Sequence, residues 1–385
     1  MHMWRGARSD WFLGRQERIA TQSRQCWRAR KLLAGGLKFP SRGDGSASPL
    51  LPQRLCWQAM PLTSATIPTV SAVIPTYNDA ARIVDALASA ANQTLPPIEI
   101  IVSDDASTDD TREVVERFAS GCTVPVRYTR HDTRAGVVAT RNEGISAAAG
   151  DWIANCDSDD YWHPSKLETQ VAFVRAWSGS AIAVVGTHGC NVNDARRVVS
   201  PATLGPLTEP EYETLRLGGI YFMLHSSIVF ARSDYLAVGG YTNEYWPVDD
   251  VHFVGRLARM GVVIAVPESL TFYRKRAGSI QHSQFWGHRY QLDRLDANEQ
   301  RRAQGEPPLT IDEFHRMRRS APPRERLTYW LYGRAKYHYR CGAVEFVNDR
   351  KARGGLHIVL ATLLARDLTH MRRAARAISY RLRRQ

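Results

Sequence analysis

The stretch VSAVIPTYNDAARIVDALASAANQTLPPIEIIVSDDAST, residues 70–108, has the pattern of a strand, a helix and a second strand. Its two apolar runs, SAVI and IEIIV, are each followed by polar residues and predict buried strands. Between them, Ile83, Val84, Leu87 and Ala91 recur at helical spacing. Elements in this order predict a βαβ unit whose two strands run parallel.

The same alternation continues along the chain. Further strands are predicted at VPVRYTR (124–130), DWIANCDSDD (151–160), AIAVVGTH (181–188), within HSSIVFARSDYLAVGGY (225–241) and at VVIAVPESLTFYRKR (262–276). Further helices are predicted at DDTREVVERFAS (109–120), GVVATRNEGISAAAG (136–150), HPSKLETQVAFVRAW (163–177) and DDVHFVGRLARMG (249–261). These alternating units predict an α/β fold: a mostly parallel, Rossmann-like central sheet with helices on both faces. From about residue 285 onward the chain reads as helical and basic.

The net charge of +13 resembles that of a nucleic-acid-binding protein, but its distribution does not. Residues 1–66 carry a net charge of +8 and residues 366–385 one of +6, so the part between them is close to neutral. We therefore expect no nucleic-acid partner. Residues 1–66 show no sustained period and are expected to be irregular or disordered, with Met60 as an alternative translation start.

The cysteine content gives no sign of a disulfide framework or a zinc site. The six cysteines, Cys26, Cys56, Cys122, Cys156, Cys190 and Cys341, are scattered without C-x-x-C spacing. Such usage favours reduced thiols and a cytoplasmic protein. No run of 18 apolar residues is present, so we expect no membrane span.

Two acidic clusters each follow a predicted strand. They are Asp104-Asp105 and the run from Asp157 to Asp160. In open α/β sheets, ligands bind beyond the carboxyl ends of the strands, so both clusters lie where a site is expected. Asp157 and Asp159 offer oxygen ligands suited to Mg²⁺ or Mn²⁺, with substrate phosphates completing the coordination. An acidic turn capping the next helix is the structural alternative, and the cluster alone does not exclude it.

Several other templates for metal or phosphate binding do not fit. No G-x-G-x-x-G and no G-x-x-x-x-G-K-[ST] is present, and Tyr161 and Trp162 stand where a calcium loop needs its third ligand and glycine. An aspartyl phosphatase would need threonine where Tyr161 stands. A nucleotidyl or phosphoryl transferase using the same acidic cluster remains an alternative.

Three stretches together resemble family 2 glycosyltransferases, which have the GT-A fold. They begin with VSAVIPTYN and IEIIVSDDASTDDT, continue with RAGVVATRNEGISAAAGDWIANCDSDDYWHPSKL, and end with DDVHFVGRLARMG. The resemblance covers about residues 68–280. It implies that the PTYN motif and the Arg-Asn pair contact the nucleotide, that Asp105 reads a uracil ring, and that the Asp-Ser-Asp motif holds ribose, metal and diphosphate. The implied nucleotide-binding residues are Pro75, Tyr77, Asn78, Asp105, Arg141, Asn142, Asp157 and Ser158, and the implied metal ligands are Asp157 and Asp159.

The resemblance also implies a catalytic base. Asp250 takes the position of the family's base, and it could accept the proton of an attacking hydroxyl. Asp249 stands beside it, and the family's commoner Glu-Asp pair is replaced here by Asp-Asp, which leaves open which of the two is the base. Structural alternatives also stay open: helix caps for Asp105 and Asp250, and a solvated charge for Arg141.

We therefore predict a metal-dependent, inverting glycosyltransferase. It would move a sugar from a nucleotide-sugar donor to an acceptor hydroxyl in polysaccharide or glycolipid synthesis. The donor is expected to be a UDP-sugar, because the Asp105 carboxylate can accept the N3 proton of uracil. The predicted catalytic domain covers residues 67–284, and a helical, basic extension covers residues 285–385. A non-enzymatic membrane- or nucleic-acid-binding protein is the alternative outside enzymes.

The C-terminal stretch LHIVLATLLARDLTHMRRAARAISYRLRRQ, residues 356–385, has apolar residues at helical spacing and many arginines. One interpretation is a helix packed on the catalytic domain with a solvated basic rim. The other is a helix lying on the anionic inner face of the cytoplasmic membrane, where it would meet a lipid-linked acceptor. The sequence leaves both open.

Overall fold

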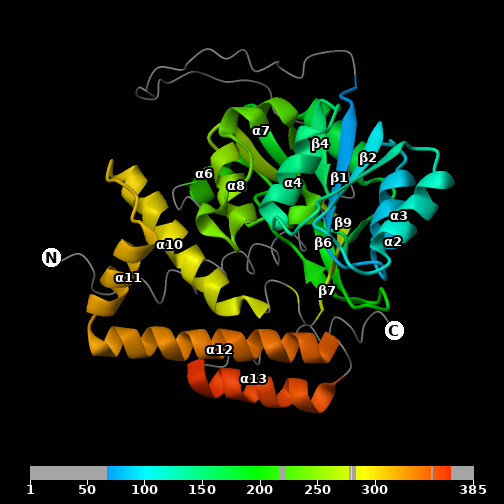
Figure 1. Cartoon of the computed structure of the whole chain (residues 1–385). Helices are drawn as coiled ribbons and strands as arrows, with labels where there is room; N and C mark the ends of the chain where they lie inside the picture. The colour runs from blue at the N-terminus through cyan, green and yellow to red at the C-terminus, as the bar shows by residue number, and fades with distance from the viewer. Residues whose placement is uncertain (1–66, 217–221, 277–278, 280–282, 348–349, 366–385) are drawn as a thin grey trace, which may run out of the picture. The chain divides into compact units, whose positions relative to one another are not determined.

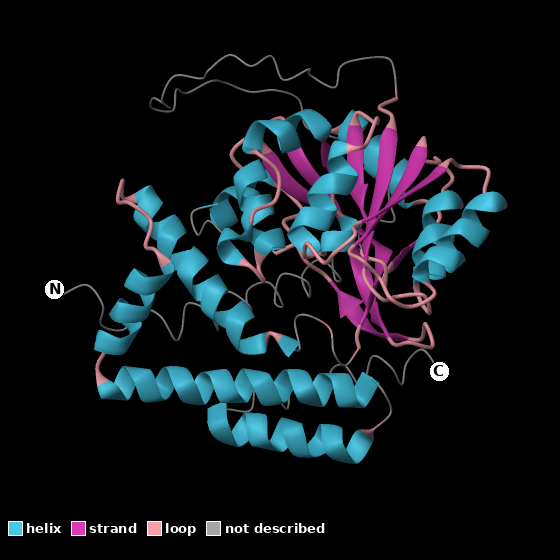
Figure 2. Cartoon of the chain, viewed as in Figure 1, coloured by secondary structure: helices cyan, strands magenta, loops and turns pink. Residues whose placement is uncertain are grey.

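The computed structural model describes residues 67–216, 222–276, 279, 283–347 and 350–365. The expectations for residues 1–66 and 366–385 therefore lie outside the described residues. A nine-stranded sheet has the strand order β3-β2-β1-β4-β8-β6-β9-β5, with β7 paired to β6. Figure 2 shows helices flanking this sheet on either side, and Figure 1 labels the elements.

The strands are β1 (Val70–Thr76), β2 (Glu99–Asp104), β3 (Val126–Arg130), β4 (Trp152–Asn155), β5 (Tyr161–Trp162), β6 (Ile182–Val192), β7 (Val198–Ala202), β8 (Val229–Ala231) and β9 (Val262–Arg274). The α-helices up to the last strand are α2 (Ile83–Ala91), α3 (Thr111–Ser120), α4 (Val137–Ser146), α5 (Lys166–Ala176), α6 (Glu209–Arg216), α7 (Arg232–Val238) and α8 (Asp249–Leu257). Two short 3₁₀ helices are η1 (His225–Ser227) and η2 (Asn243–Tyr245). After β9 come α10 (Phe285–Ala303), α11 (Ile311–Ser320), α12 (Pro323–Val347) and α13 (Lys351–Ala365).

The predicted α/β fold with a helical C-terminal region is confirmed, and its first half is parallel as expected. β1 pairs in parallel with both β2 and β4, and β2 pairs in parallel with β3. The second half is mixed, because the short β8 runs antiparallel to both β4 and β6. An apolar run predicts burial but not strand direction, so the pattern alone could not reveal this reversal.

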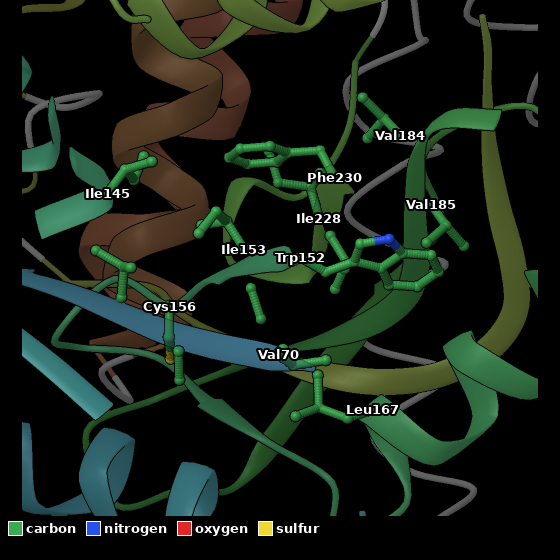
Figure 3. Close-up of a cluster of buried hydrophobic side chains, with 14 of the residues drawn as sticks. Val70, Ile145, Trp152, Ile153, Cys156, Leu167, Val184, Val185, Ile228 and Phe230 are labelled. Atoms are coloured by element: carbon green, nitrogen blue, oxygen red, sulfur yellow. The ribbon is translucent and has the colours of Figure 1, made fainter. Parts of the chain in front are cut away.

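The core joins the two halves of the sheet. Figure 3 shows side chains from helices and strands far apart in the chain meeting there, including Ile145, Ile153, Leu167, Val184 and Phe230. All five are almost fully buried. Because β1, β2 and β4 are buried along their whole length, their carboxyl ends are held in fixed positions relative to one another.

A glycine sets the distance between α4 and the sheet. A Cβ atom on Gly144 would lie 2.6 Å from Ser103 Oγ and 2.8 Å from Val73 Cγ1. Those separations are shorter than van der Waals contact, so glycine allows α4 to pack directly on β1 and β2. This close packing brings the polar side chains of α4 up to the ends of the strands.

The last described helix, α13, packs on α12. It does so through Gly354, Ile358 and Ala361, which are buried, whereas Leu356 is 62% exposed and Leu363 68% exposed. Of the apolar positions predicted at helical spacing from Leu356, Leu360 and Leu364 are half-buried, and those from residue 366 onward lie outside the described residues. None of the helices in the described part of the chain combines the length and the apolar character needed to cross a bilayer.

A buried lysine lies behind the turn between β4 and β5. The Lys166 side chain is fully buried, its Nζ lies 4.1 Å from the centre of the Trp162 ring, and this Nζ has no hydrogen-bond partner among the described residues. Burial lowers the pKa of Lys166 to about 7. A charged group without a partner in the core costs free energy of folding.

Lys166→Met is therefore expected to raise the free energy of unfolding at pH 7 by on the order of 2 kcal/mol. The folded-state pKa lies below the unfolded value, so the unfolded chain binds more protons and wild-type stability rises as the pH increases from about 7 to about 10. Urea unfolding at pH 7 and pH 9 measures both effects, with Lys351→Met on the surface of α13 as the control. A Lys166→Met protein less stable than wild type at pH 7 would contradict this explanation.

Candidate functional site

Two of the predicted acids, Asp157 and Asp249, are brought together beyond the carboxyl end of β4. Arg141, on α4, connects them: its Nη1 donates to Asp249 Oδ2 at 2.7 Å, and its Nη2 donates to Asp157 Oδ1 at 3.1 Å. The arginine side chain is only 10% exposed. One buried guanidinium therefore joins the acid after β4 to the acid at the start of α8, 92 residues further along the chain. It is not a solvated surface charge.

Asp157 is held in its ionised form. Its Oδ1 also lies 3.3 Å from His225 Nδ1, on η1. Burial alone would raise the pKa of Asp157, but Arg141 and His225 outweigh burial and hold that pKa well below its usual range.

The other two acids of the cluster have different partners. Asp159 Oδ2 accepts a hydrogen bond from Arg276 Nε at 2.6 Å. Asp160 is fully buried, accepting from Ser226 Oγ at 2.5 Å and from the backbone N–H of Arg274 at 2.8 Å. Burial raises the pKa of Asp160 well above its usual range, and Asp159 and Asp157 add to this effect. Asp160 thus anchors the turn to β9.

Three of the predicted nucleotide-binding residues, Pro75, Tyr77 and Asn78, lie at the end of β1 and in the loop that follows it. Pro75 is buried inside β1, whereas Tyr77 is 38% exposed, and the Arg134 guanidinium lies 3.7 Å from the centre of its ring. Asn78 Oδ1 accepts from the backbone N–H of Thr108, which joins this loop to the one after β2. Tyr77 and Asn78 are both exposed, but the Asn78 amide is engaged by Thr108, so Tyr77 offers the freer surface for ligand contact.

Asp105 lies at the end of β2, facing the loop before α4. Its Oδ1 accepts hydrogen bonds from the backbone N–H groups of Ala135, at 2.7 Å, and Gly136, at 3.0 Å, and lies 3.4 Å from His131 Nδ1. Its Oδ2 lies 3.5 Å from Arg134 Nε, whose side chain is 60% exposed. Asp105 is thus not a simple helix cap, and within the described residues its Oδ2 is paired with the exposed Arg134 side chain.

Asn142 and Ser158 contact protein groups within the site. Asn142 Nδ2 donates to the carbonyl of Tyr241 at 2.9 Å, and its Oδ1 accepts from the backbone N–H of the same tyrosine at 2.9 Å. Ser158 Oγ donates to Asp79 Oδ2 at 2.7 Å. In this structure both side chains fix neighbouring segments, and nucleotide contact by either one stays a prediction.

The two candidate bases differ in their surroundings. Asp249 is buried and paired with Arg141, whereas Asp250 is half-buried, and its Oδ1 accepts only the N–H of Val251 among the hydrogen bonds of the described residues. Burial raises the pKa of Asp250, and the neighbouring Asp249 raises it further. A half-buried carboxylate with raised proton affinity suits a base better than one committed to an ion pair.

Several residues of the site were missed from the sequence. His225, Ser226, Arg276 and Asp79 all contact the acidic cluster, but they come from three separate segments. Contacts between residues this far apart in the chain depend on the fold, and no local pattern reports them. For His225 and Ser226 the sequence carries one signal: the polar tripeptide HSS, residues 225–227, adjoins a predicted strand.

The donor atoms of the acidic cluster fit a divalent cation in type but not in number. Asp157 and Asp159 supply carboxylate oxygens, which Mg²⁺ and Mn²⁺ prefer. Among the described residues, no group of three or more His, Cys, Asp or Glu side chains is placed to hold a metal ion. Mg²⁺ commonly uses one or two protein carboxylates together with substrate phosphates, so this pair fits an ion bound jointly with a nucleotide diphosphate.

The chain is similar in sequence to known glycosyltransferases. Residues 71–238 match the model of the family described as glycosyl transferase family 2. The chain is 32% identical over 174 residues to the putative glycosyltransferase EpsE of Bacillus subtilis, covering 45% of this chain and 60% of EpsE. It is 35% identical over 105 residues to WfaP of Escherichia coli, a UDP-Glc:alpha-D-GlcNAc-diphosphoundecaprenol beta-1,3-glucosyltransferase, covering 27% of this chain and 41% of WfaP.

Each match thus spans less than two thirds of the relative's length. Among solved structures, Staphylococcus aureus TarS 1–349 in complex with UDP is similar with a TM-score of 0.48 and 17% identity, covering 77% of this chain and 89% of that one.

Proposed function

We propose that the protein transfers a sugar from a nucleotide-sugar donor to an acceptor hydroxyl, as the match of residues 71–238 to the model of glycosyl transferase family 2 supports. The family resemblance read from the sequence is confirmed. The observation that carries the proposal is Arg141, whose one guanidinium binds both Asp157 and Asp249. Arg141 therefore holds Asp157, which is proposed to act on the donor side, close to Asp249, which directly precedes the proposed base Asp250.

Asp250 is the proposed base, and the chemistry follows from its surroundings. It takes the proton of the acceptor hydroxyl as that oxygen attacks the anomeric carbon. Arg141 neutralises Asp249, so only one of the two neighbouring acids is free to accept the proton. One base and one direct displacement give inversion at the anomeric carbon.

The donor side is proposed to bind a uridine nucleotide. Asp105 can accept the N3 proton of uracil, and Tyr77 offers an exposed ring nearby on the same edge of the sheet. The name of WfaP, which specifies UDP-Glc, supports this choice of nucleotide. A divalent cation bound at Asp157 and Asp159, Mn²⁺ or Mg²⁺, would supply positive charge at the leaving diphosphate.

The acceptor is proposed to be lipid-linked or a polysaccharide. WfaP is named for a diphosphoundecaprenol acceptor. The exposed Leu356, Val359 and Leu363 of α13 give one apolar face beside the basic start of that helix. We assign residues 67–284 to catalysis and residues 285–385 to an extension that places this face on an anionic membrane.

Liposome flotation tests the membrane contact. The full chain should float with anionic vesicles, and a Leu356→Ser, Val359→Ser, Leu363→Ser variant should not. A variant that floats as well as the wild-type protein would remove this part of the proposal.

A panel of nucleotides tests the function. UDP-, GDP- and dTDP-sugars are added with Mn²⁺, and the melting temperature is measured for wild type and Asp159→Ala. We expect UDP-sugars to give the largest rise, and the Mn²⁺-dependent part of that rise to be lost in Asp159→Ala. Stabilisation by nucleoside triphosphates alone would favour a nucleotidyl or phosphoryl transferase, and no stabilisation by any nucleotide sugar would contradict the proposal.

A further inference from the structure

The two carboxylates proposed to bind the cation already have cationic partners, and these partners differ. Arg141, which pairs with Asp157, is 10% exposed and also holds Asp249. Arg276, which pairs with Asp159, is 31% exposed. Asp157 therefore has a fixed partner, and Asp159 has one whose side chain reaches solvent.

The backbone that carries Arg276 is firmly attached to the acidic turn. Two residues earlier, the backbone N–H of Arg274 donates to Asp160 Oδ1, and the Arg274 Nε donates to the carbonyl of Asp159 at 2.7 Å. Arg274 Nη2 also donates to Asp85 Oδ2 at 2.7 Å. The end of β9 is thus fixed against the turn, so the Arg276 guanidinium stays within reach of the acidic cluster in any rotamer that points toward it.

The charge balance of the site changes when a donor binds. In the donor-free protein, the Arg276–Asp159 pair joins opposite charges. A nucleotide diphosphate placed beside Asp159 adds negative charge at the same point, and a guanidinium binds phosphate oxygens through two parallel hydrogen bonds. Phosphate is then a stronger partner for Arg276 than a single carboxylate oxygen.

We propose that Arg276 exchanges partners: it pairs with Asp159 in the donor-free protein and with the diphosphate of the donor once this is bound, which leaves Asp159 free to bind the divalent cation. This rests on the proposed function. Arg276 thereby competes with the cation for Asp159 when no donor is present and contributes to diphosphate binding when it is. The site binds metal weakly until the diphosphate arrives.

Two titrations, both measured by isothermal titration calorimetry, test the exchange. In the first, Mn²⁺ alone is added to donor-free protein, and Arg276→Ala should bind it about tenfold more tightly than wild type, because neither the competing ion pair nor the positive charge remains. In the second, UDP is added without metal, and Arg276→Ala should bind it about tenfold more weakly. Arg276→Lys, which keeps the charge but not the paired donors, should give intermediate values for both.

The controls separate this exchange from other effects. Arg324→Ala removes an exposed arginine at the start of α12 and should match wild type in both titrations. Equal melting temperatures of wild type and Arg276→Lys show that the fold is intact. Mn²⁺ binding by Arg276→Ala that is unchanged or weaker than wild type would overturn the proposal. Failure of wild type to bind UDP would instead count against the proposed function, and the Mn²⁺ titration would still test the exchange at Asp159.

Discussion

Asp250→Asn is expected to lower kcat about a thousandfold while leaving donor binding unchanged, because the amide cannot accept the proton of the acceptor hydroxyl. The change is nearly isosteric, and the hydrogen bond from the N–H of Val251 to the side-chain oxygen is kept. Initial rates with saturating donor, together with UDP binding, measure the two effects separately. Glu268→Gln, on an exposed part of β9, is the matched control and should retain wild-type kcat.

The same residue sets the dependence of the rate on pH. Burial and Asp249 raise the pKa of Asp250, and the base acts only when ionised. The value of kcat/KM should therefore fall as the pH is lowered, and the midpoint of this fall should lie above the usual aspartate pKa of about 4. Because ionised Asp250 is disfavoured in the folded state, its charge reduces stability as the pH rises through that pKa, so Asp250→Asn should not destabilise the protein at neutral pH. A low kcat accompanied by unfolding would refute the catalytic interpretation.

Arg141→Met is expected to have the largest effect on stability. It leaves Asp157 and Asp249 buried without their shared partner, and breaking a buried pair of this kind costs about 3–5 kcal/mol. The free energy of unfolding should fall by that amount at pH 7, and binding of UDP with Mn²⁺ should be lost. Arg141→Lys should recover part of the stability but not the binding, since lysine cannot reach both acids with one planar group.

A second buried arginine gives the control. Arg294, on α10, lies over the Tyr245 ring and donates to the carbonyl of Glu244, and none of these groups belongs to the proposed site. Arg294→Met should lose stability while the folded fraction still binds UDP. If Arg141→Met were as stable as wild type, or kept full nucleotide binding, the bridging role of Arg141 would be wrong.

The sequence was most informative where function and local pattern coincide. The apolar runs that end at Thr76, Asp104 and Asn155 predicted the strands, and the acids that follow the second and third of them predicted the edge of the sheet where the site lies. The start of α8 at Asp249 also follows from its helical pattern. These predictions depend on residues close together in the chain.

Other features depend on tertiary contacts, and for that reason the sequence could not reveal them. His225 and Arg276 reach the acidic cluster from segments 68 and 117 residues away. The exposed Leu356 shows the same limit for packing: helical spacing predicts an apolar face, but the positions of Gly354 and Ile358 against α12 decide which face is buried.

Turnover of the donor tests the central claim most directly. Wild-type protein and Asp250→Asn are incubated with UDP-sugars, Mn²⁺ and a lipid-linked or polysaccharide acceptor, and the release of UDP and the anomeric configuration of the product are measured. The account predicts UDP release by wild type, inversion at the anomeric carbon, and a rate about a thousandfold lower in Asp250→Asn. Retention of configuration, or equal rates in the two proteins, would contradict it.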